Sequence, residues 1–116
     1  SSDVCSSDLR ALTIKEMAEL YSSPDAKAKF VSSFATPGHV PLLLASSGLL
    51  AKRQGHTEMS VYLAKLANLT PVTAICEMMD GQTYKALTPE KAQTFAKQNA
   101  IPFVDGKELL EFSEVR

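Results

Sequence analysis

The sequence predicts an α/β domain, built as a layered mixed sheet with flanking helices. Short continuous apolar runs, typical of buried strands, alternate along the chain with longer segments whose apolar residues recur at helical spacing. This alternation favours strands and helices that pack in layers. The chain has 116 residues, of which 45% are hydrophobic and 22% are charged, the size and composition of one globular domain.

The first helices are predicted from apolar spacing and from signals at their ends. Residues 11–21 form a helix that stops before a proline, because the residue that precedes proline avoids the helical region. A further helical turn is expected over 25–30, followed by irregular chain over 31–38. Residues 57–68 form the next helix, with Thr57 as its N-cap.

Two later helix starts carry stronger signals. Residues 88–90, Thr-Pro-Glu, combine an N-cap hydroxyl, a proline in the first turn and a carboxylate at the positive end of the helix. Residues 105–108, Asp-Gly-Lys-Glu, resemble a capping box that opens a last helix.

Strands are expected over 41–45, 49–51, 72–78 and 101–104. The first of these is a continuous apolar run that suits a strand buried on both faces, although a buried helix would show the same pattern. The third is also expected to be a buried strand, and the last contains a proline, which suits a sheet edge. A turn is expected at Asp80, which precedes a glycine.

Charge and composition exclude several classes of function. The net charge is −1, so the surface as a whole does not attract nucleic acid or an anionic membrane. The sequence contains no apolar run of about 18 residues, which a membrane-spanning helix requires, and no signal peptide is visible. The chain has two cysteines, Cys5 and Cys76, which are too few for a disulfide framework. We therefore expect a reducing environment and a cytoplasmic location. Cys76 is expected to be a small core residue.

Residues 1–9 are expected to be foreign to the protein. They lack a helical or strand period, repeat the tripeptide Ser-Ser-Asp, and resemble the translation of a common sequencing-library adapter. The alternative is a natural disordered terminus. On the first interpretation, the natural part of this chain covers residues 10–116.

The candidate site centres on two histidines that each follow a glycine. Residues 53–58, Arg-Gln-Gly-His-Thr-Glu, lead into the helix predicted from Thr57, whose first N–H groups favour an anion. Arg53 can bind phosphate oxygens in bidentate fashion, Gly55 lets a ligand approach the backbone, and His56 can bind a divalent metal or move a proton. The alternative is a surface loop with a helix cap and no ligand.

Two further residues are candidates for proton transfer. His39 lies in a Pro-Gly-His-Val-Pro segment ahead of the first apolar run, where it can act as a general acid or base. The alternative is a hydrogen-bonded structural histidine. Glu77 comes late in an apolar run, where a carboxylate is costly unless it is paired, protonated or bound to a metal. The alternative is a strand-end glutamate that reaches water.

Together these segments resemble one enzyme family. Residues 37–41 (Pro-Gly-His-Val-Pro), 55–58 (Gly-His-Thr-Glu) and 75–77 (Ile-Cys-Glu) occur in the order and at the spacing seen in 3,4-dihydroxy-2-butanone 4-phosphate synthases. The likeness covers nearly all of residues 10–111 and is closest to the archaeal-type branch.

The resemblance implies a reaction and a role for each motif residue. Members of this family convert D-ribulose 5-phosphate into 3,4-dihydroxy-2-butanone 4-phosphate and formate, a step of riboflavin synthesis, with Mg²⁺ or Mn²⁺ and as homodimers with shared active sites. It implies that His56 is a metal ligand, that Glu77 binds substrate hydroxyls and transfers protons, and that His39 is essential for activity. The implied contacts to the phosphorylated substrate are Arg53, Gln54, Gly55, His56, Thr57 and Glu77. Gln54 departs from the glycine of many relatives, which leaves its own role open.

The resemblance also implies that part of the site is missing. The family's N-terminal half carries an acidic loop with a further metal ligand, and nothing in this chain matches it. Residues 10–116 are therefore expected to be the C-terminal part of a single, N-terminally truncated synthase domain, inactive alone and loosely packed or aggregated. The alternatives are a non-enzymatic α/β module that binds a phosphorylated ligand, and a longer bifunctional chain in which a cyclohydrolase follows.

Overall fold

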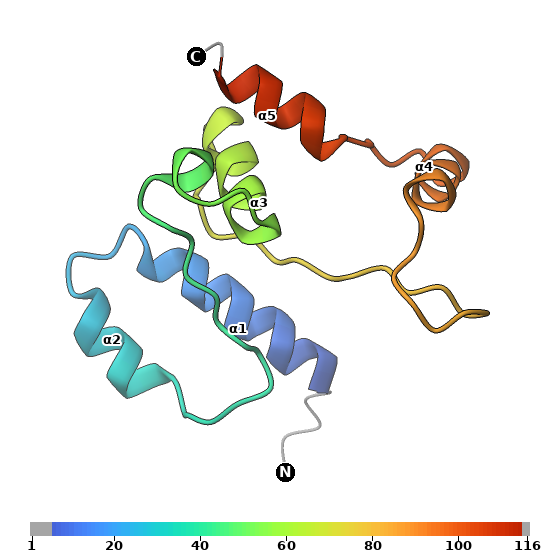
Figure 1. The fold of residues 1–116 in the computed structure, drawn as a ribbon. Helices are drawn as coiled ribbons and strands as arrows, with labels where there is room; N and C mark the ends of the chain where they lie inside the picture. The colour runs from blue at the N-terminus through green and yellow to red at the C-terminus, as the bar shows by residue number, and fades with distance from the viewer. Residues whose placement is uncertain (1–5, 115–116) are drawn as a thin grey trace. The chain divides into compact units, whose positions relative to one another are not determined.

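The computed structural model describes residues 6–114, and its regular elements are helices (Figure 1). In chain order they are α1 (Ser6–Leu20), α2 (Ala26–Ser33), the 3-10 helix η1 (Leu49–Ala51), α3 (His56–Leu66), α4 (Pro89–Gln98) and α5 (Gly106–Glu114). Contacts between residues divide the chain into two compact units, one that ends at Ala74 and one that begins at Ile75. Within residues 6–114, no helix is both long and apolar enough to cross a membrane.

The first unit begins with α1, which confirms the helix predicted over 11–21. The structure extends this helix back to Ser6, so residues 6–9 are helical although their sequence shows no helical period. The remainder of the segment expected to be foreign, including Cys5, lies outside the described residues. That expectation therefore stays a prediction.

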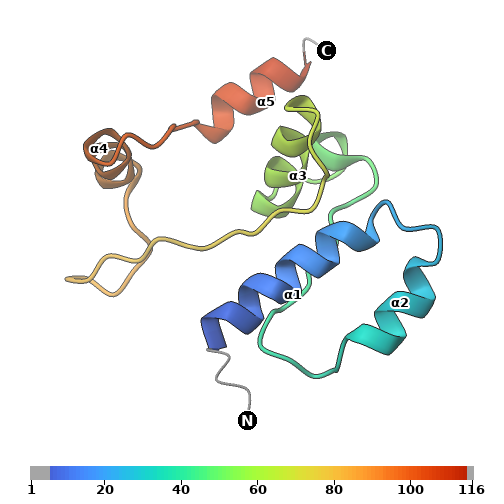
Figure 2. The same cartoon turned by 180° about the vertical axis from the view of Figure 1, so that it is seen from behind.

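α2 packs beside α1, as Figure 1 and Figure 2 show from opposite sides. It confirms the helical turn predicted over 25–30 but continues to Ser33, so the irregular chain expected over 31–38 starts later than predicted. The Phe34 backbone N–H donates to the Phe30 carbonyl at 3.1 Å, and the two rings stack with centroids 5.1 Å apart. This aromatic pair is one turn apart and supports the extra turn of helix.

The strand predicted over 49–51 is wrong, because this segment forms η1. Its hydrogen-bonding groups are used locally: Leu49 N donates to the Ser46 carbonyl at 2.8 Å, and Lys52 N donates to the Leu49 carbonyl at 2.9 Å. In a strand, these backbone N–H and C=O groups would bond to a neighbouring strand. η1 packs against α3, and Leu50 is buried. The apolar residues 49–51 therefore pack a helical turn against α3 and do not form a strand.

The other predicted strands, 41–45, 72–78 and 101–104, are non-helical and form no ladder among the described residues. Beyond them, one isolated antiparallel bridge joins Met79 and Ala86. The leucines of the first segment are exposed. The layered mixed sheet accordingly stays a prediction.

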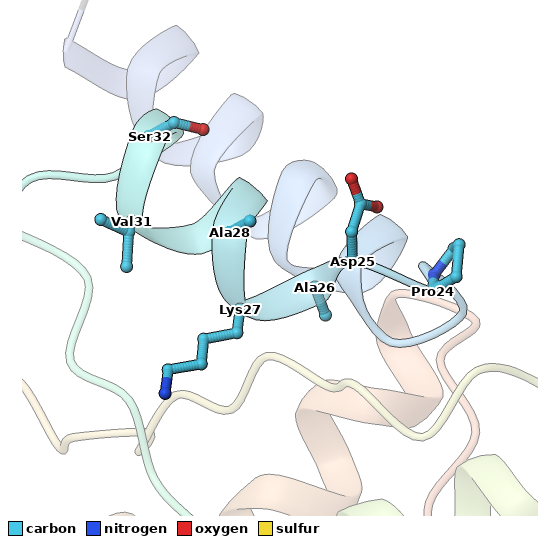
Figure 3. A pocket seen from close by; sticks show the side chains of 7 residues that line it. All are labelled: Pro24, Asp25, Ala26, Lys27, Ala28, Val31 and Ser32. Atoms are coloured by element: carbon cyan, nitrogen blue, oxygen red, sulfur yellow. The ribbon is translucent and has the colours of Figure 1, made fainter.

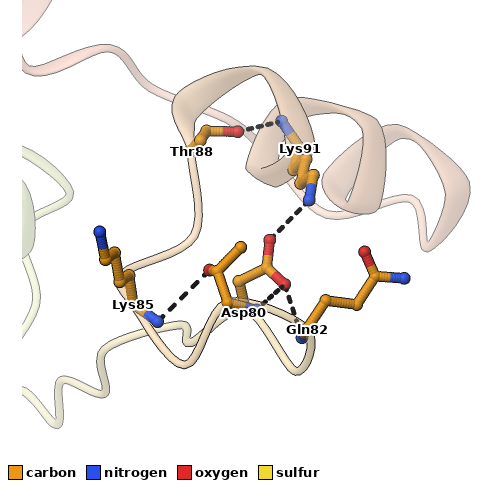
Figure 4. Close-up of polar contacts among 6 residues, drawn as sticks. Asp80, Gln82, Lys85, Thr88 and Lys91 are labelled. Carbon is orange, nitrogen blue, oxygen red and sulfur yellow. Dashed lines mark hydrogen bonds and ion pairs between the residues drawn. The ribbon is translucent and has the colours of Figure 1, made fainter.

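The second unit contains the turn predicted at Asp80, tied to the start of α4 (Figure 4). One oxygen of the buried Asp80 carboxylate accepts hydrogen bonds from the backbone N–H groups of Gln82 and Thr83, at 2.8 and 3.3 Å. The other oxygen accepts one from Lys91 Nζ at 2.6 Å. Donation by Lys91, and then by the two backbone groups, lowers the pKa of Asp80 from 3.8 to about 2. Thr88 caps α4 as predicted, accepting from Lys91 N at 3.4 Å.

The last helix also starts as predicted. Asp105 Oδ1 accepts a hydrogen bond from Lys107 N at 2.7 Å, and α5 begins at the intervening Gly106. Ala96 of α4 and Leu109 of α5 are buried. Both helix starts depend on bonds within a few residues, which explains why the sequence predicts them well.

Candidate functional site

The candidate site is the loop that leads from η1 into α3. α3 begins at His56, and its N-cap is Gly55, in an extended conformation (φ −101°, ψ 166°) without a side-chain cap hydrogen bond. The prediction of Thr57 as N-cap is therefore wrong, because Thr57 lies inside the first turn. The first N–H groups of α3 thus have no side-chain cap, and the positive end of the helix dipole can take an anion.

A buried carboxylate lies behind this loop. Glu58, in the first turn of α3, has a relative exposure of 0%, and its Oε1 accepts a hydrogen bond from Ser46 N at 3.1 Å. Arg53 Nη1 lies 3.7 Å from the same oxygen, while the Arg53 side chain is 67% exposed. The Ser46 hydrogen bond is the main cause of a lowered pKa for Glu58, and the charge of Arg53 acts in the same direction. Glu58 is therefore held as an anion.

The burial of Glu58 does not follow from the local sequence, in which it is only the last member of residues 53–58. The available signal was its place in the first turn of a helix, where a glutamate side chain often turns back toward the preceding loop. Here the side chain bonds Ser46, 12 residues earlier, and does not cap its own helix. That long-range partner could not be read from local sequence.

Gly55 lies against the buried carboxylate of Glu58. A Cβ atom at position 55 would lie 2.7 Å from Glu58 Oε2, closer than van der Waals contact allows. The φ of −101° is open to any residue, so the demand is steric and not conformational. From its residue type, this glycine is predicted to let a ligand approach the backbone. The structure shows a carboxylate of the chain itself at that position.

The remaining loop residues are accessible to a ligand. Gln54 and His56 are exposed, and Thr57 is half-buried. The structure thus brings five of the six residues predicted to contact the phosphorylated substrate, residues 53–57, onto one short loop and the first turn of α3. The sixth, Glu77, belongs to the second unit.

These residues do not by themselves fit a magnesium ion. Mg²⁺ prefers near-octahedral coordination by several oxygen ligands. Within residues 6–114 there is no group of three or more His, Cys, Asp and Glu side chains that could hold a metal. His56 can therefore contribute at most one ligand to a site completed elsewhere.

His39 lies apart from this loop, on the chain that follows α2. It is exposed and borders a cavity of about 560 Å³ that α1, α2 and residues 35–42 line. None of residues 53–57 lines that cavity. The structure therefore does not place the two histidines in one pocket.

Glu77 belongs to the second unit, on the extended segment before the Asp80 turn, and it is exposed. Its neighbour Cys76 is exposed as well, with Sγ 3.6 Å from the Glu77 carbonyl oxygen. The prediction of Cys76 as a core residue is therefore wrong in this structure, since Cys76 and its neighbours Ile75 and Glu77 are all exposed. The assigned role of Glu77 stays a prediction.

An open hollow also lies along α2 (Figure 3). It is lined by Pro24, Asp25, Ala26, Lys27, Ala28, Val31 and Ser32. Asp25 forms an ion pair with Lys29, four residues later, at 3.4 Å. The hollow contains none of the predicted site residues, so the loop before α3 remains the candidate site.

The chain belongs to a known family. A family profile described as 3,4-dihydroxy-2-butanone 4-phosphate synthase matches residues 2–112. Among curated relatives, the 3,4-dihydroxy-2-butanone 4-phosphate synthase of Archaeoglobus fulgidus is 46% identical over 104 residues, which cover 88% of this chain and 44% of that protein. The synthase of Methanosarcina mazei is 43% identical over 104 residues, which cover 88% of this chain and 42% of that protein.

A third relative is the riboflavin biosynthesis protein RibBA of Aquifex aeolicus, 43% identical over 103 residues, which cover 89% of this chain and 23% of that protein. The resemblance to the synthase family and to its archaeal branch is thereby confirmed. The chain spans less than half the length of the curated relatives it matches.

Proposed function

We propose that this chain is the phosphate-binding part of a lyase of riboflavin biosynthesis, which converts D-ribulose 5-phosphate into 3,4-dihydroxy-2-butanone 4-phosphate and formate. The observation that carries the proposal is the match of the synthase family to residues 2–112, together with an accessible Arg53 beside a helix start that has no side-chain cap. A cation and free N–H groups suit the phosphate of the substrate.

The loop before α3 supplies binding energy remote from the reacting carbons. Arg53 binds the phosphate oxygens, and the first N–H groups of α3 and the Thr57 hydroxyl complete the contact. Binding of the phosphate orients the sugar chain. The loss of translational and rotational freedom that the reaction requires therefore occurs partly on binding, which lowers the barrier of the later step. Gln54 and Gly55 shape the wall of this subsite.

Proton transfer is proposed for two residues outside the loop. The reaction needs protons removed and returned beside a carbonyl group, and imidazole and carboxylate side chains do this near neutral pH. We assign these steps to His39 and Glu77, both of which are exposed in the chain. Glu77 also binds substrate hydroxyls in this proposal.

We further propose that the complete protein uses Mg²⁺ or Mn²⁺, works as a homodimer with shared active sites, and is cytoplasmic. His56 supplies one metal ligand, and side chains from the part of the relatives that this chain does not cover supply the others. When bound, such an ion stabilises negative charge on the substrate oxygens.

The test is release of formate from D-ribulose 5-phosphate by the complete protein. We expect His56→Ala and Glu77→Ala each to lower the rate by at least about 100-fold, the scale of lost acid–base or metal function. Glu90→Gln, at an exposed glutamate in the first turn of α4, is the matched control and should leave the rate unchanged. Residues 1–116 alone should release no formate.

The alternative is a non-enzymatic module that binds a phosphorylated ligand. It predicts that the complete protein binds D-ribulose 5-phosphate but releases no formate. Near-normal rates for both alanine variants would instead contradict the assigned roles and leave the family membership intact.

A further inference from the structure

We propose that Glu58 is a positioning residue for the phosphate subsite, which acts through Arg53 and through the backbone at Ser46. The inference rests on the proposed function, because it assumes that the loop of residues 53–57 binds a phosphate. It adds to that function a buried residue that holds the loop in its binding shape.

The first argument is the contrast in exposure between the two charged partners. Glu58 is fully buried, whereas 67% of the Arg53 side chain is exposed. The carboxylate approaches the guanidinium at Nη1 alone, at 3.7 Å, which is a charge contact rather than a hydrogen bond. A guanidinium has five N–H donors, so its other donors stay free for a ligand. Glu58 thus restrains Arg53 without using up its donors.

The second argument is the bond to Ser46. Ser46 follows the apolar segment 41–45 and precedes η1, and its backbone N–H donates to Glu58 Oε1 at 3.1 Å. One carboxylate therefore ties the chain before η1 to the first turn of α3. This bond closes a stretch of chain that contains η1 and residues 53–57, and so restrains the loop proposed to bind the phosphate.

The third argument is the second carboxylate oxygen. Glu58 Oε2 is buried and has no hydrogen-bond partner in the part of the chain that the structure describes. An unpaired buried oxygen lowers the stability of the fold. If this position mattered only for stability, a fully hydrogen-bonded or an apolar side chain would stabilise the fold more. The same oxygen would lie 2.7 Å from a Cβ atom at position 55, so a larger residue there would displace it. Glu58 and Gly55 therefore form one steric unit beneath the loop.

These contacts predict a specific kinetic effect for Glu58→Gln in the complete protein. Glutamine keeps the size and the acceptor for Ser46 N but removes the charge that restrains Arg53. We expect KM for D-ribulose 5-phosphate to rise about tenfold, the scale of one charge-assisted contact, with kcat changed by less than about threefold. Glu90→Gln should change neither constant.

A double-mutant cycle separates positioning from a merely structural role. If Glu58 acts through Arg53, then Glu58→Gln should raise KM no further in an Arg53→Gln background. An equal rise in both backgrounds would overturn the proposal, because the glutamate would then act without the arginine. Gly55→Ala, which keeps the charge but displaces Oε2, should raise KM in the same direction, and it takes the place of Glu58→Gln if that variant does not fold.

A second measurement keeps this inference distinct from the proposed reaction. If the wild-type protein releases no formate, the reaction fails, and binding of inorganic phosphate then tests Glu58 alone. Equal weakening of phosphate binding by Glu58→Gln and Arg53→Gln supports the positioning role. Unchanged phosphate affinity in Glu58→Gln overturns it.

Discussion

A buried carboxylate lies at the start of α3 and another in the turn before α4, but their hydrogen bonds differ. At α4, Asp80 accepts hydrogen bonds on both oxygens, and Thr88 caps the helix (Figure 4). At α3, Glu58 is paired through one oxygen, and the N-cap Gly55 makes no side-chain bond. Before α4, both oxygens of the carboxylate and the N-terminal helix cap are hydrogen-bonded within the chain. At the start of α3, the first backbone N–H groups and the exposed Arg53 guanidinium remain available to a ligand. This difference distinguishes a structural turn from a loop suited to bind an anion.

The largest effect of a single change on the free energy of unfolding is expected where η1 packs against α3. Leu50 is buried where η1 packs against α3, so Leu50→Ala in the complete protein should cost about 2–5 kcal/mol in the free energy of unfolding. Chemical denaturation measures this. Gln93→Ala, at an exposed polar side chain of α4, is the control and should change stability by less than about 0.5 kcal/mol. Equal effects would show that η1 does not cover the α3 junction.

The Asp80 junction should be the more sensitive of the two to acid. Its pKa is about 2 in the folded chain against 3.8 ordinarily, so its stabilising effect is complete above the unfolded value and is lost as pH falls from about 4 toward 2. Asp80→Asn should remove this dependence, as followed by the unfolding transition at a series of pH values. An unchanged acid transition in Asp80→Asn would show that the Lys91 contact does not stabilise the turn.

A smaller effect is expected at the cap of α4. Thr88→Ala removes the acceptor for Lys91 N and should destabilise the helix by about 1 kcal/mol. Hydrogen exchange of the α4 amides measures the loss. Thr88→Ser keeps the hydroxyl and should restore protection; if it does not, the cap is not what holds this junction closed.

The helix starts could be predicted from sequence because their bonds are local. Thr88 bonds Lys91 N and Asp105 bonds Lys107 N, each within three residues. The loop of residues 53–57 was found for a similar reason, since its residue types lie together in the sequence. The predicted strand over 49–51 failed because turn hydrogen bonds took up its backbone groups, a competition that apolar content does not reveal.

The sequence by itself determined the family, the two later helix starts and the residues that meet on the loop before α3. Each of these depends on residue types at short, fixed spacing. The tertiary structure alone decided that Glu58 is buried, that Ser46 is its partner and that Gly55 lies against its carboxylate. Those facts depend on the hydrogen bond between Ser46 and Glu58, 12 residues apart, in the region where η1 packs against α3. Local sequence spacing does not reveal such a contact.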